Sequence, residues 1–447
     1  MRAVGACAAK TPLEAWVAGK LAMQDRPLTR TTIQDYQLDA LKETVAWARS
    51  HCSFYAGRLS ALPDGVPDSL EDVARLPLTT ATDLAENTPG FLCVSQDEIS
   101  RVVTLQTSGT SGVPKRVFFT AADQELALDF FAHGVASIAE PGDRMLIALP
   151  GEREGSVGYQ LAKGIARAGV IPVLHGLSVD PSATLARMDE ESTTCFIGLP
   201  VQTLALAMNE STIAGSVMRR LRSIVFCSDH VPQSLVSTLR RKSGAEIFEH
   251  YGMTEMGLGG GLDCDAHMGY HLREADLYFE IVDPETGEPL PEGERGEIVF
   301  TTLNRTGMPL IRYRTGDVSR FVPGPCECGT ILRRLERVRR RVDGSICLGT
   351  SGCVDISVLD EALFAVPGLL DFAGTFFQGV PGRLELAVYS PSIDGALLSA
   401  RAVEAVYTIP TIRNGRACGE LQIDVVVADE PFPVTGAKRR IEVRAGQ

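Results

Sequence analysis

A segment rich in glycine, serine and threonine, residues 107–115 (TSGTSGVPK), has the composition of a phosphate-binding loop. Glycines let the backbone approach an anion closely, while backbone N–H groups and hydroxyls donate hydrogen bonds to its oxygens. The segment is not a P-loop, because Gly109 and Gly112 stand too close together and Lys115 follows a proline. The composition predicts phosphate binding, although on its own it also fits a flexible surface loop.

A set of cysteine and histidine residues has the chemistry of a metal site. Cys326 and Cys328 lie in a turn rich in proline and glycine, and Cys264 and His271 flank a short stretch before a predicted strand. Thiolate and imidazole ligands in a tetrahedral set suit a structural zinc ion. His267 is an alternative fourth ligand, and the alternative to a metal site is a pair of free turn cysteines beside unrelated polar residues.

Two further segments, residues 249–255 (EHYGMTE) and 313–317 (YRTGD), follow the glycine-rich loop. In this order the three motifs resemble those of the adenylate-forming superfamily, which comprises acyl-CoA synthetases, peptide-synthetase adenylation domains and luciferases. Within it the chain is most similar to the phenylacetate-CoA ligase family, on residues 53–59, 283–317 and 323–329. This family also shows a similar pattern of cysteine and histidine.

The resemblance implies an ATP-dependent, AMP-forming acid–CoA ligase that acts on an aryl or arylacetic-type acid. A carboxylate would attack the α-phosphate of ATP to give an acyl-adenylate and pyrophosphate, and the thiol of CoA would then give a thioester and AMP. Because both steps build negative charge, we expect hydrogen-bond donors, a cation and Mg²⁺ in the site. Homodimers are common in this family, so a homodimer is also implied.

The resemblance implies a role for each motif residue. Thr254 would contact the α-phosphate, Glu255 would bind Mg²⁺, a hard cation that takes oxygen ligands, and Asp317 would accept hydrogen bonds from both ribose hydroxyls. Tyr251 would stack near the adenine and Gly252 would leave room for the acyl chain. Taken alone, Glu255 also fits a solvated surface acid, and Asp317 a turn residue. The residues implied in binding ATP or AMP are Thr107, Ser108, Gly109, Thr110, Ser111, Gly112, Lys115, Ser228, Asp229, Tyr251, Gly252, Asp317 and Arg341.

Near the C-terminus, Lys438 matches the catalytic lysine that holds the carboxylate and α-phosphate oxygens, a role that suits a flexible point charge. Relatives carry Gly-Lys, whereas Ala437 separates Gly436 from Lys438 here, so a basic tail residue is the alternative. Arg341 aligns with an arginine that reaches the ribose. Asp343 aligns with an interdomain hinge, where a few residues absorb large backbone changes.

Two segments depart from the family pattern. Residues 227–229 (CSD) stand where relatives carry Gly-Ala-Glu against the adenine, and residues 349–352 (GTSG) lack the arginine and asparagine of a loop used in the thiol step. Two alternatives therefore stay open. One is an adenylyltransferase of the same fold whose acceptor is not CoA, and the other is a non-catalytic binding protein on a decayed ligase fold.

Residues 151–176 match the helix and strand that line the acyl pocket in relatives. Tyr159 and His250 are the candidate pocket residues. The charged residues 152–154 (ERE) lie at the pocket mouth or in a solvated loop, and the solvated loop is the preferred interpretation.

Elements predicted from hydrophobic periodicity must position these residues. Residues 35–60 predict an amphipathic helix that ends near Ser53. Strand-like and helical runs alternate from residue 101 to 252, which indicates an α/β fold with a helix-covered parallel sheet. Beyond residue 270 two strand-like runs flank a turn-rich segment and predict an antiparallel region.

The predicted domains are an N-terminal ATP- and acid-binding domain over residues 1–341 and a small, mobile α+β domain over residues 342–447. Most of the six arginines in residues 333–341 are expected on a solvated face, with Arg341 alone in the site.

Composition excludes several other classes of protein. The 447 residues carry a net charge of −13, which argues against nucleic-acid or anionic-membrane binding because phosphate contacts need clustered Lys and Arg. No stretch approaches the length of a transmembrane helix, and we expect no signal peptide. The eleven scattered cysteines predict a cytoplasmic protein with reduced thiols.

Overall fold

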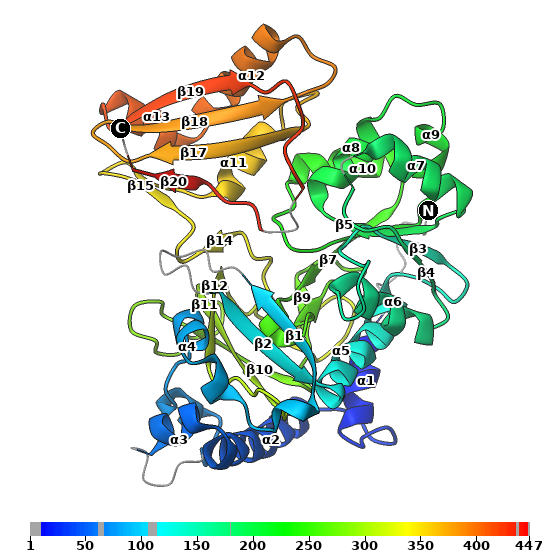
Figure 1. Ribbon diagram of the computed structural model, residues 1–447, viewed down its shortest axis with the longest axis vertical. Coiled ribbons are helices and arrows are strands. Elements are labelled where there is room, and N and C mark those ends of the chain that lie inside the picture. Colours follow the sequence, from blue (N-terminus) through cyan, green and yellow to red (C-terminus); the bar gives the residue numbers. More distant parts are fainter. Residues whose placement is uncertain (1–9, 61–66, 106–113, 179, 435–437, 446–447) are drawn as a thin grey trace. The chain divides into compact units, whose positions relative to one another are not determined.

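The computed structural model describes residues 10–60, 67–105, 114–178, 180–434 and 438–445 (Figure 1). Two compact units are present, and each combines segments that are distant in sequence. The first unit comprises Met1–Pro141, Tyr159–Val170 and Phe248–Val338, and the second comprises Gly142–Gly158, Ile171–Ile247 and Arg339–Gln447. These units do not test the predicted boundary between an N-terminal domain at residues 1–341 and a C-terminal domain at residues 342–447, which stays a prediction.

The helices of the first unit are α1 (Pro12–Lys20), α2 (Arg30–His51), α3 (Ser53–Leu59), α4 (Ala81–Glu86), α5 (Ala121–Gly134) and most of α6 (Val157–Arg167). Helix α2 begins before the predicted residue 35, because Thr29 and Thr32 exchange side chain-to-backbone hydrogen bonds in a capping box. Its apolar face, which includes Leu41 and Val45, lies in the core of the unit. The helix ends at His51, close to the predicted end.

The strands of the first unit are β1 (Ile99–Leu105), β2 (Lys115–Thr120), the end of β7 (Glu246–Tyr251), β8 (Gly261–Leu262), β9 (Tyr270–Leu272), β10 (Leu277–Val282), β11 (Gly296–Thr302), β12 (Tyr313–Ser319) and β13 (Arg334–Leu335). Strands β1 and β2 form an antiparallel pair. Strands β10, β11 and β12 form an antiparallel sheet, which confirms the antiparallel region predicted beyond residue 270. Strands β7, β8, β9 and β13 also pair antiparallel.

The second unit contains β3 (Arg144–Ile147), β4 (Ile171–Leu174), β5 (Cys195–Gly198) and β6 (Ser223–Phe226), which pair in parallel in the order β4-β3-β5-β6. The accompanying helices are α7 (Pro181–Glu190), α8 (Pro200–Met208), α9 (Ala214–Arg220) and α10 (Gln233–Ser243). The parallel sheet and the α/β fold class are confirmed. The sequence interpretation missed α8. This helix is largely buried and apolar and closely follows β5, so its hydrophobic periodicity does not distinguish a helix from a strand.

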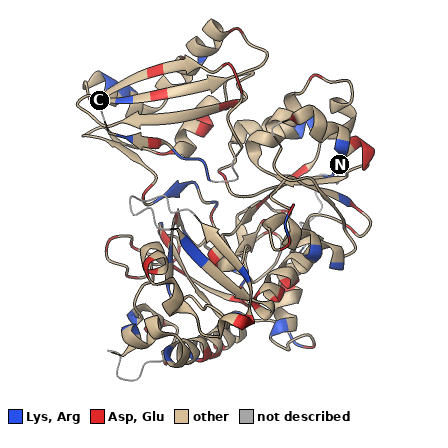
Figure 2. Cartoon of the chain, viewed as in Figure 1, with Lys and Arg blue, Asp and Glu red and all other residues tan. Residues whose placement is uncertain are grey.

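The rest of the second unit is built on a sheet of order β19-β18-β17-β20. Its elements are β14 (Arg340–Arg341), β15 (Ile346–Leu348), β16 (Gly352–Val354), α11 (Ile356–Leu363), β17 (Asp371–Phe377), β18 (Gly382–Tyr389), α12 (Gly395–Tyr407), α13 (Pro410–Ala417), β19 (Leu421–Val427) and β20 (Glu442–Arg444). Within the described residues, no helix is both long and apolar enough to cross a membrane. Basic and acidic residues are interspersed along the elements (Figure 2).

One sequence expectation fails in part and another is wrong. The arginines before Arg341 are not all solvated: Arg334 is 3% exposed, and Arg337 pairs with Glu249 and Asp263 at 2.9 and 3.0 Å. The cysteines are also not all reduced, because Cys347 and Cys353 form a disulfide that joins β15 to β16.

Candidate active site

The predicted phosphate loop connects β1 to β2. Residues Thr107 to Gly112 lie outside the described residues. Leu105 pairs with Lys115 across the two strands, so the two ends of the loop are adjacent in the hairpin. Lys115 therefore begins β2 directly beside the loop.

Lys115, Glu255 and Tyr313 form a buried polar cluster. Glu255 is 1% exposed, and its carboxylate makes an ion pair with the Lys115 ammonium. The Tyr313 hydroxyl donates to Glu255 Oε1 at 3.2 Å, and Lys115 Nζ donates to that hydroxyl at 3.4 Å. A buried carboxylate is stable only when its charge is met in this way. The end of the phosphate loop (Lys115), the segment 249–255 (Glu255) and the segment 313–317 (Tyr313) therefore meet at one point.

Arg305 supports this cluster and was not singled out in the sequence. Its guanidinium donates to the backbone oxygens of Glu255 at 2.7 Å and Phe118 at 2.9 Å, and its centre lies 4.3 Å from the centroid of the Phe119 ring. Burial lowers the pKa of Arg305 to about 10, which leaves the group charged at neutral pH. Arg305 thereby links the Glu255 turn to β2. A single arginine in a turn gives no sequence signal of such a role.

Thr254 and Glu255 begin a short 3₁₀ helix, Thr254–Met256, directly after β7. The bend before it depends on Gly252, because a Cβ atom at that position would stand 2.0 Å from the backbone oxygen of Leu258. The expected reason for this glycine was room for an acyl chain. That role stays a prediction, and the structure adds a further reason, which is the close approach of two backbone segments.

Tyr251 and Asp317 are brought together on neighbouring elements of the first unit. Asp317 is fully buried on β12, and the Tyr251 hydroxyl donates to its Oδ2 at 3.2 Å. The Tyr251 ring stacks on Tyr270 with centroids 5.7 Å apart. The Asp317 carboxylate is therefore held by a phenol that is itself fixed by packing.

The two acyl-pocket candidates lie on different elements. His250 lies on β7 near Phe130 and Phe131, with ring centroids 6.3 and 6.4 Å away. Burial, together with the charge of Arg273, lowers the pKa of His250 to about 4, so the imidazole is neutral. Its Nε2 atom is buried without a hydrogen-bond partner among the described residues. Tyr159 lies on α6, where the Lys163 ammonium lies 5.6 Å from its ring centroid. Residues 152–154 are exposed, as the preferred interpretation expected.

The remaining predicted residues lie in the second unit. Ser228 follows β6 with a φ of 77°, a left-handed conformation that is costly for a residue other than glycine. Burial raises the pKa of Asp229, and the positive charges of Arg439 and Lys438 act against that rise. Arg341 on β14 makes an ion pair with Asp343 at 3.5 Å.

The loop at residues 349–352 is held by a carboxylate of its own unit. The backbone N–H and hydroxyl of Thr350 donate to Glu420 Oε1, and those of Ser351 donate to Oε2. These hydrogen bonds lower the pKa of Glu420 to about 2. The disulfide between Cys347 and Cys353 closes the base of the same loop.

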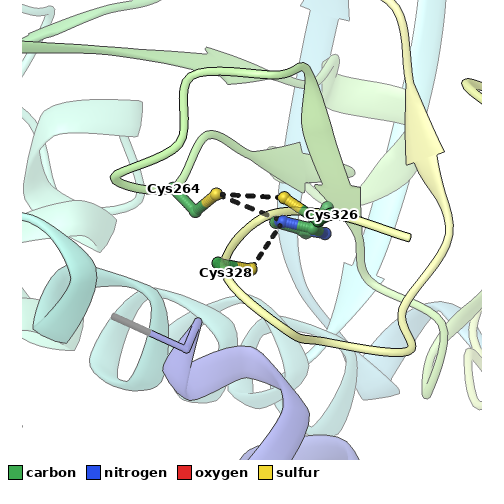
Figure 3. A group of neighbouring side chains, drawn as sticks. Cys264, Cys326 and Cys328 are labelled. Carbon is green, nitrogen blue, oxygen red and sulfur yellow. Dashed lines mark hydrogen bonds between the residues drawn. The ribbon is translucent and has the colours of Figure 1, made fainter. Parts of the chain in front are cut away.

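The Cys/His set forms a compact cluster in the first unit (Figure 3). The sulfur atoms of Cys264, Cys326 and Cys328 and a ring nitrogen of His271 all lie within 4.8 Å of one another, and all four residues are buried. His271 Nε2 lies 3.3 Å from the Cys264 sulfur and 3.5 Å from that of Cys328. The alternative ligand His267 instead contacts Asp263 at 2.9 Å. The donor set fits a tetrahedral zinc ion.

Two arginines support the Cys/His cluster. Arg334 donates to the backbone oxygens of Gly324 and Pro325, at 3.1 Å each, beside the turn that carries two of the cysteines. Arg337 pairs with Asp263, the residue before Cys264. These contacts explain why Arg334 is buried and Arg337 is half-buried within the basic run.

Comparison with known proteins assigns the family. The model of the family described as "AMP-binding enzyme" matches residues 68–305, more than half of the chain. The chain therefore belongs to the AMP-binding enzyme family, in agreement with the resemblance to adenylate-forming enzymes.

Within that family the chain is similar to phenylacetate-CoA ligases. It is 28% identical over 402 residues to the phenylacetate-coenzyme A ligase of Thermus thermophilus, covering 87% of this chain and 89% of the relative. It is 30% identical over 326 residues to that of Escherichia coli, covering 71% and 72%. The fold matches a crystal structure of 2-hydroxyisobutyryl-CoA ligase in complex with 2-HIB-AMP, with a TM-score of 0.75, 22% identity and coverage of 95% and 90%.

Proposed function

We propose that this chain is an ATP-dependent, AMP-forming acid–CoA ligase that acts on an aryl or arylacetic-type acid. The observation that carries the proposal is the coincidence of two results. The motif residues Lys115, Glu255, Tyr251 and Asp317 form buried, hydrogen-bonded clusters. In addition, relatives named phenylacetate-coenzyme A ligase align with most of the chain.

The proposed site handles negative charge in two places. Glu255 would hold Mg²⁺, since its buried carboxylate supplies the oxygen ligand that this cation prefers. Mg²⁺ and the Lys115 ammonium would compete for the Glu255 carboxylate. Once Mg²⁺ is bound there, Lys115 would be available to the phosphates of ATP. Asp317 would accept hydrogen bonds from the ribose hydroxyls, and the hydrogen bond from Tyr251 would orient its carboxylate.

The ammonium of Lys438 is the proposed group for the carboxylate and α-phosphate oxygens. A positive charge placed where negative charge develops in the transition state lowers the barrier to adenylation. The second half-reaction would use CoA as the acceptor. The loop at residues 349–352 is tied to Glu420 and departs from the family pattern, so the acceptor needs a direct test.

The acid class is supported by relatives and by local polarity. His250 is neutral and lies near Phe130 and Phe131, an environment that suits an apolar or aromatic group rather than a second charge.

The Cys/His cluster is proposed to bind a structural zinc ion. Burial raises the pKa of the Cys264 and Cys326 thiols, because it disfavours thiolates; a bound divalent cation offsets this cost by taking the thiolates as ligands. The hinge at Asp343, a homodimer and a cytoplasmic location stay predictions from the resemblance and the composition.

The test is acid-dependent exchange of labelled pyrophosphate into ATP, across arylacetic, aryl and short aliphatic acids. The same acids are then assayed for AMP release with and without CoA. We expect exchange with an aryl or arylacetic acid and AMP release that depends on CoA. Exchange that never responds to CoA would indicate an adenylyltransferase with another acceptor, and a chain that binds ATP without any exchange would contradict the proposal.

A further inference from the structure

A buried cluster of charged residues surrounds Arg439, the residue that follows the candidate catalytic lysine. The Arg439 guanidinium lies 3.5 Å from Asp360 Oδ1 and 3.5 Å from Asp371 Oδ1, and it donates to the backbone oxygen of Phe372 at 2.9 Å. Its backbone N–H donates to Asp229 Oδ1 at 2.9 Å. Every one of these contacts lies within the second unit.

The anchoring groups come from three separate segments. Asp229 follows β6, Asp360 lies on α11, and Asp371 begins β17. The guanidinium also lies over aromatic rings, 5.1 Å from the centroid of Phe364 and 4.5 Å from that of Phe372. A planar guanidinium meets several carboxylates and a ring face at once, which an ammonium cannot do. The position is therefore specific for arginine.

The guanidinium pairs with two carboxylates, those of Asp360 and Asp371, while Asp229 accepts from the backbone N–H of Arg439. His230 and Glu361 form a further pair at 3.1 Å. Burial raises the pKa of Asp360 to about 6, and the charge of Arg439 acts against that rise. Removal of the guanidinium would leave the Asp360 and Asp371 carboxylates without this cation, although the backbone N–H of residue 439 could still donate to Asp229. Because such groups repel one another and are poorly solvated, the contact at Arg439 is a strong anchor for the chain.

On the other side of Arg439, the chain enters β20, which pairs in parallel with β17. Arg439 thus lies between a paired strand and Lys438. Both positive charges act on Asp229, the residue whose motif stands at the adenine side in relatives.

We propose that Arg439 is a positioning residue for adenylation: it ties the chain at Lys438 to Asp229, Asp360 and Asp371 and so sets where the lysine ammonium can reach. This inference rests on the proposed function. Arg439 itself touches no reacting atom. It acts by holding Lys438, and a displacement of about 1 Å at a catalytic group can cost about 100-fold in rate.

The test measures the two half-reactions in Arg439→Met, Arg439→Lys and Asp360→Asn, with Arg440→Met as the matched control, since Arg440 is the exposed neighbour. In Arg439→Met we expect kcat for pyrophosphate exchange to fall by about 100-fold. KM for the acid should stay within about threefold, because the contacts described for Arg439 do not include the acyl-pocket candidates Tyr159 and His250. Thioester formation from supplied acyl-adenylate should be retained.

The remaining variants separate positioning from folding. Arg439→Lys should recover part of the exchange rate, and Asp360→Asn should lower it less than Arg439→Met does. Equal loss of both half-reactions, or a rate equal to that of Arg440→Met, would overturn the inference.

The inference can fail separately from the proposed function. If the wild-type chain shows no pyrophosphate exchange with any acid, the proposed function fails. Amide hydrogen exchange then tests whether Arg439 anchors the chain at Lys438. Arg439→Met should lose protection over residues 438–445 relative to Arg440→Met, and unchanged protection would overturn the anchor.

Discussion

Glu255 is a buried carboxylate whose charge is met by the ammonium of Lys115 and the hydroxyl of Tyr313. The proposed role of this carboxylate requires that Mg²⁺ take the place of the Lys115 ammonium as its cation.

Replacement of Glu255 by Gln should lower acid-dependent pyrophosphate exchange by about 100-fold, because a neutral amide binds Mg²⁺ and Lys115 far less well than a carboxylate. The measurement is the exchange rate against Mg²⁺ concentration. Glu288→Gln, at an exposed turn position, is the matched control. Exchange within threefold of wild type and an unchanged Mg²⁺ response would contradict the proposed role.

His250 predicts a pH dependence of stability. Its folded pKa of about 4 lies below the ordinary histidine value of 6.5. The unfolded chain therefore binds the extra proton, and stability falls as pH drops below about 6.5. Between pH 7 and pH 5 this group alone should cost about 2 kcal/mol of unfolding free energy. Urea denaturation at both pH values, compared with His250→Asn, measures the difference. Equal pH dependence in the two proteins would refute the assignment.

At the scale of elements, the turn after β7 positions Thr254 and Glu255, and it depends on two backbone segments in close contact. Gly252→Ala would place a Cβ atom against the Leu258 oxygen, so we expect a loss of about 1–3 kcal/mol in unfolding free energy. Gly57→Ala on α3 is the control, because a Cβ there meets nothing within 4 Å and alanine favours the helix. Denaturation should shift in opposite directions for the two variants, and no loss in Gly252→Ala would exclude the steric explanation.

Much of the element pattern was predictable. The parallel strands β3 to β6 and the antiparallel strands β10 and β11 follow from runs of apolar residues between turn signals, which are local properties of the sequence. Helix α8 was missed because it is apolar on most sides. The packed arginines Arg334 and Arg337 were missed as well, since a run of like charges usually marks a solvated face and burial depends on partners distant in sequence.

The same limit applies to the site. The motifs named Lys115, Glu255 and Asp317, and their side chains lie in buried clusters. Only the fold reveals that Arg305 contacts the Glu255 turn and that Arg439, beside Lys438, contacts Asp229. Each arginine acts through tertiary contacts that leave no spacing pattern in the chain.

At the scale of the whole molecule, the Cys/His cluster joins two distant segments of the first unit. Protein purified without added zinc should contain about one equivalent of the metal, as expected for a structural site. Elemental analysis of Cys328→Ser should show its loss, whereas Cys418→Ser, at an exposed cysteine, should keep it. A metal-free wild-type protein after gentle purification would count against the site.

The position of that cluster has a further consequence for chain entropy. Cys264 and Cys326 are 62 residues apart, and the strands β10, β11 and β12 lie between them in the sequence. A cross-link of that span removes about 4 kcal/mol of conformational freedom from the unfolded chain. A metal ion bound by Cys264 and Cys326 would cross-link the chain into a closed loop that contains Asp317. Chelation would open this loop, and the proposed ribose-binding segment at Asp317 would loosen although none of its own residues had changed.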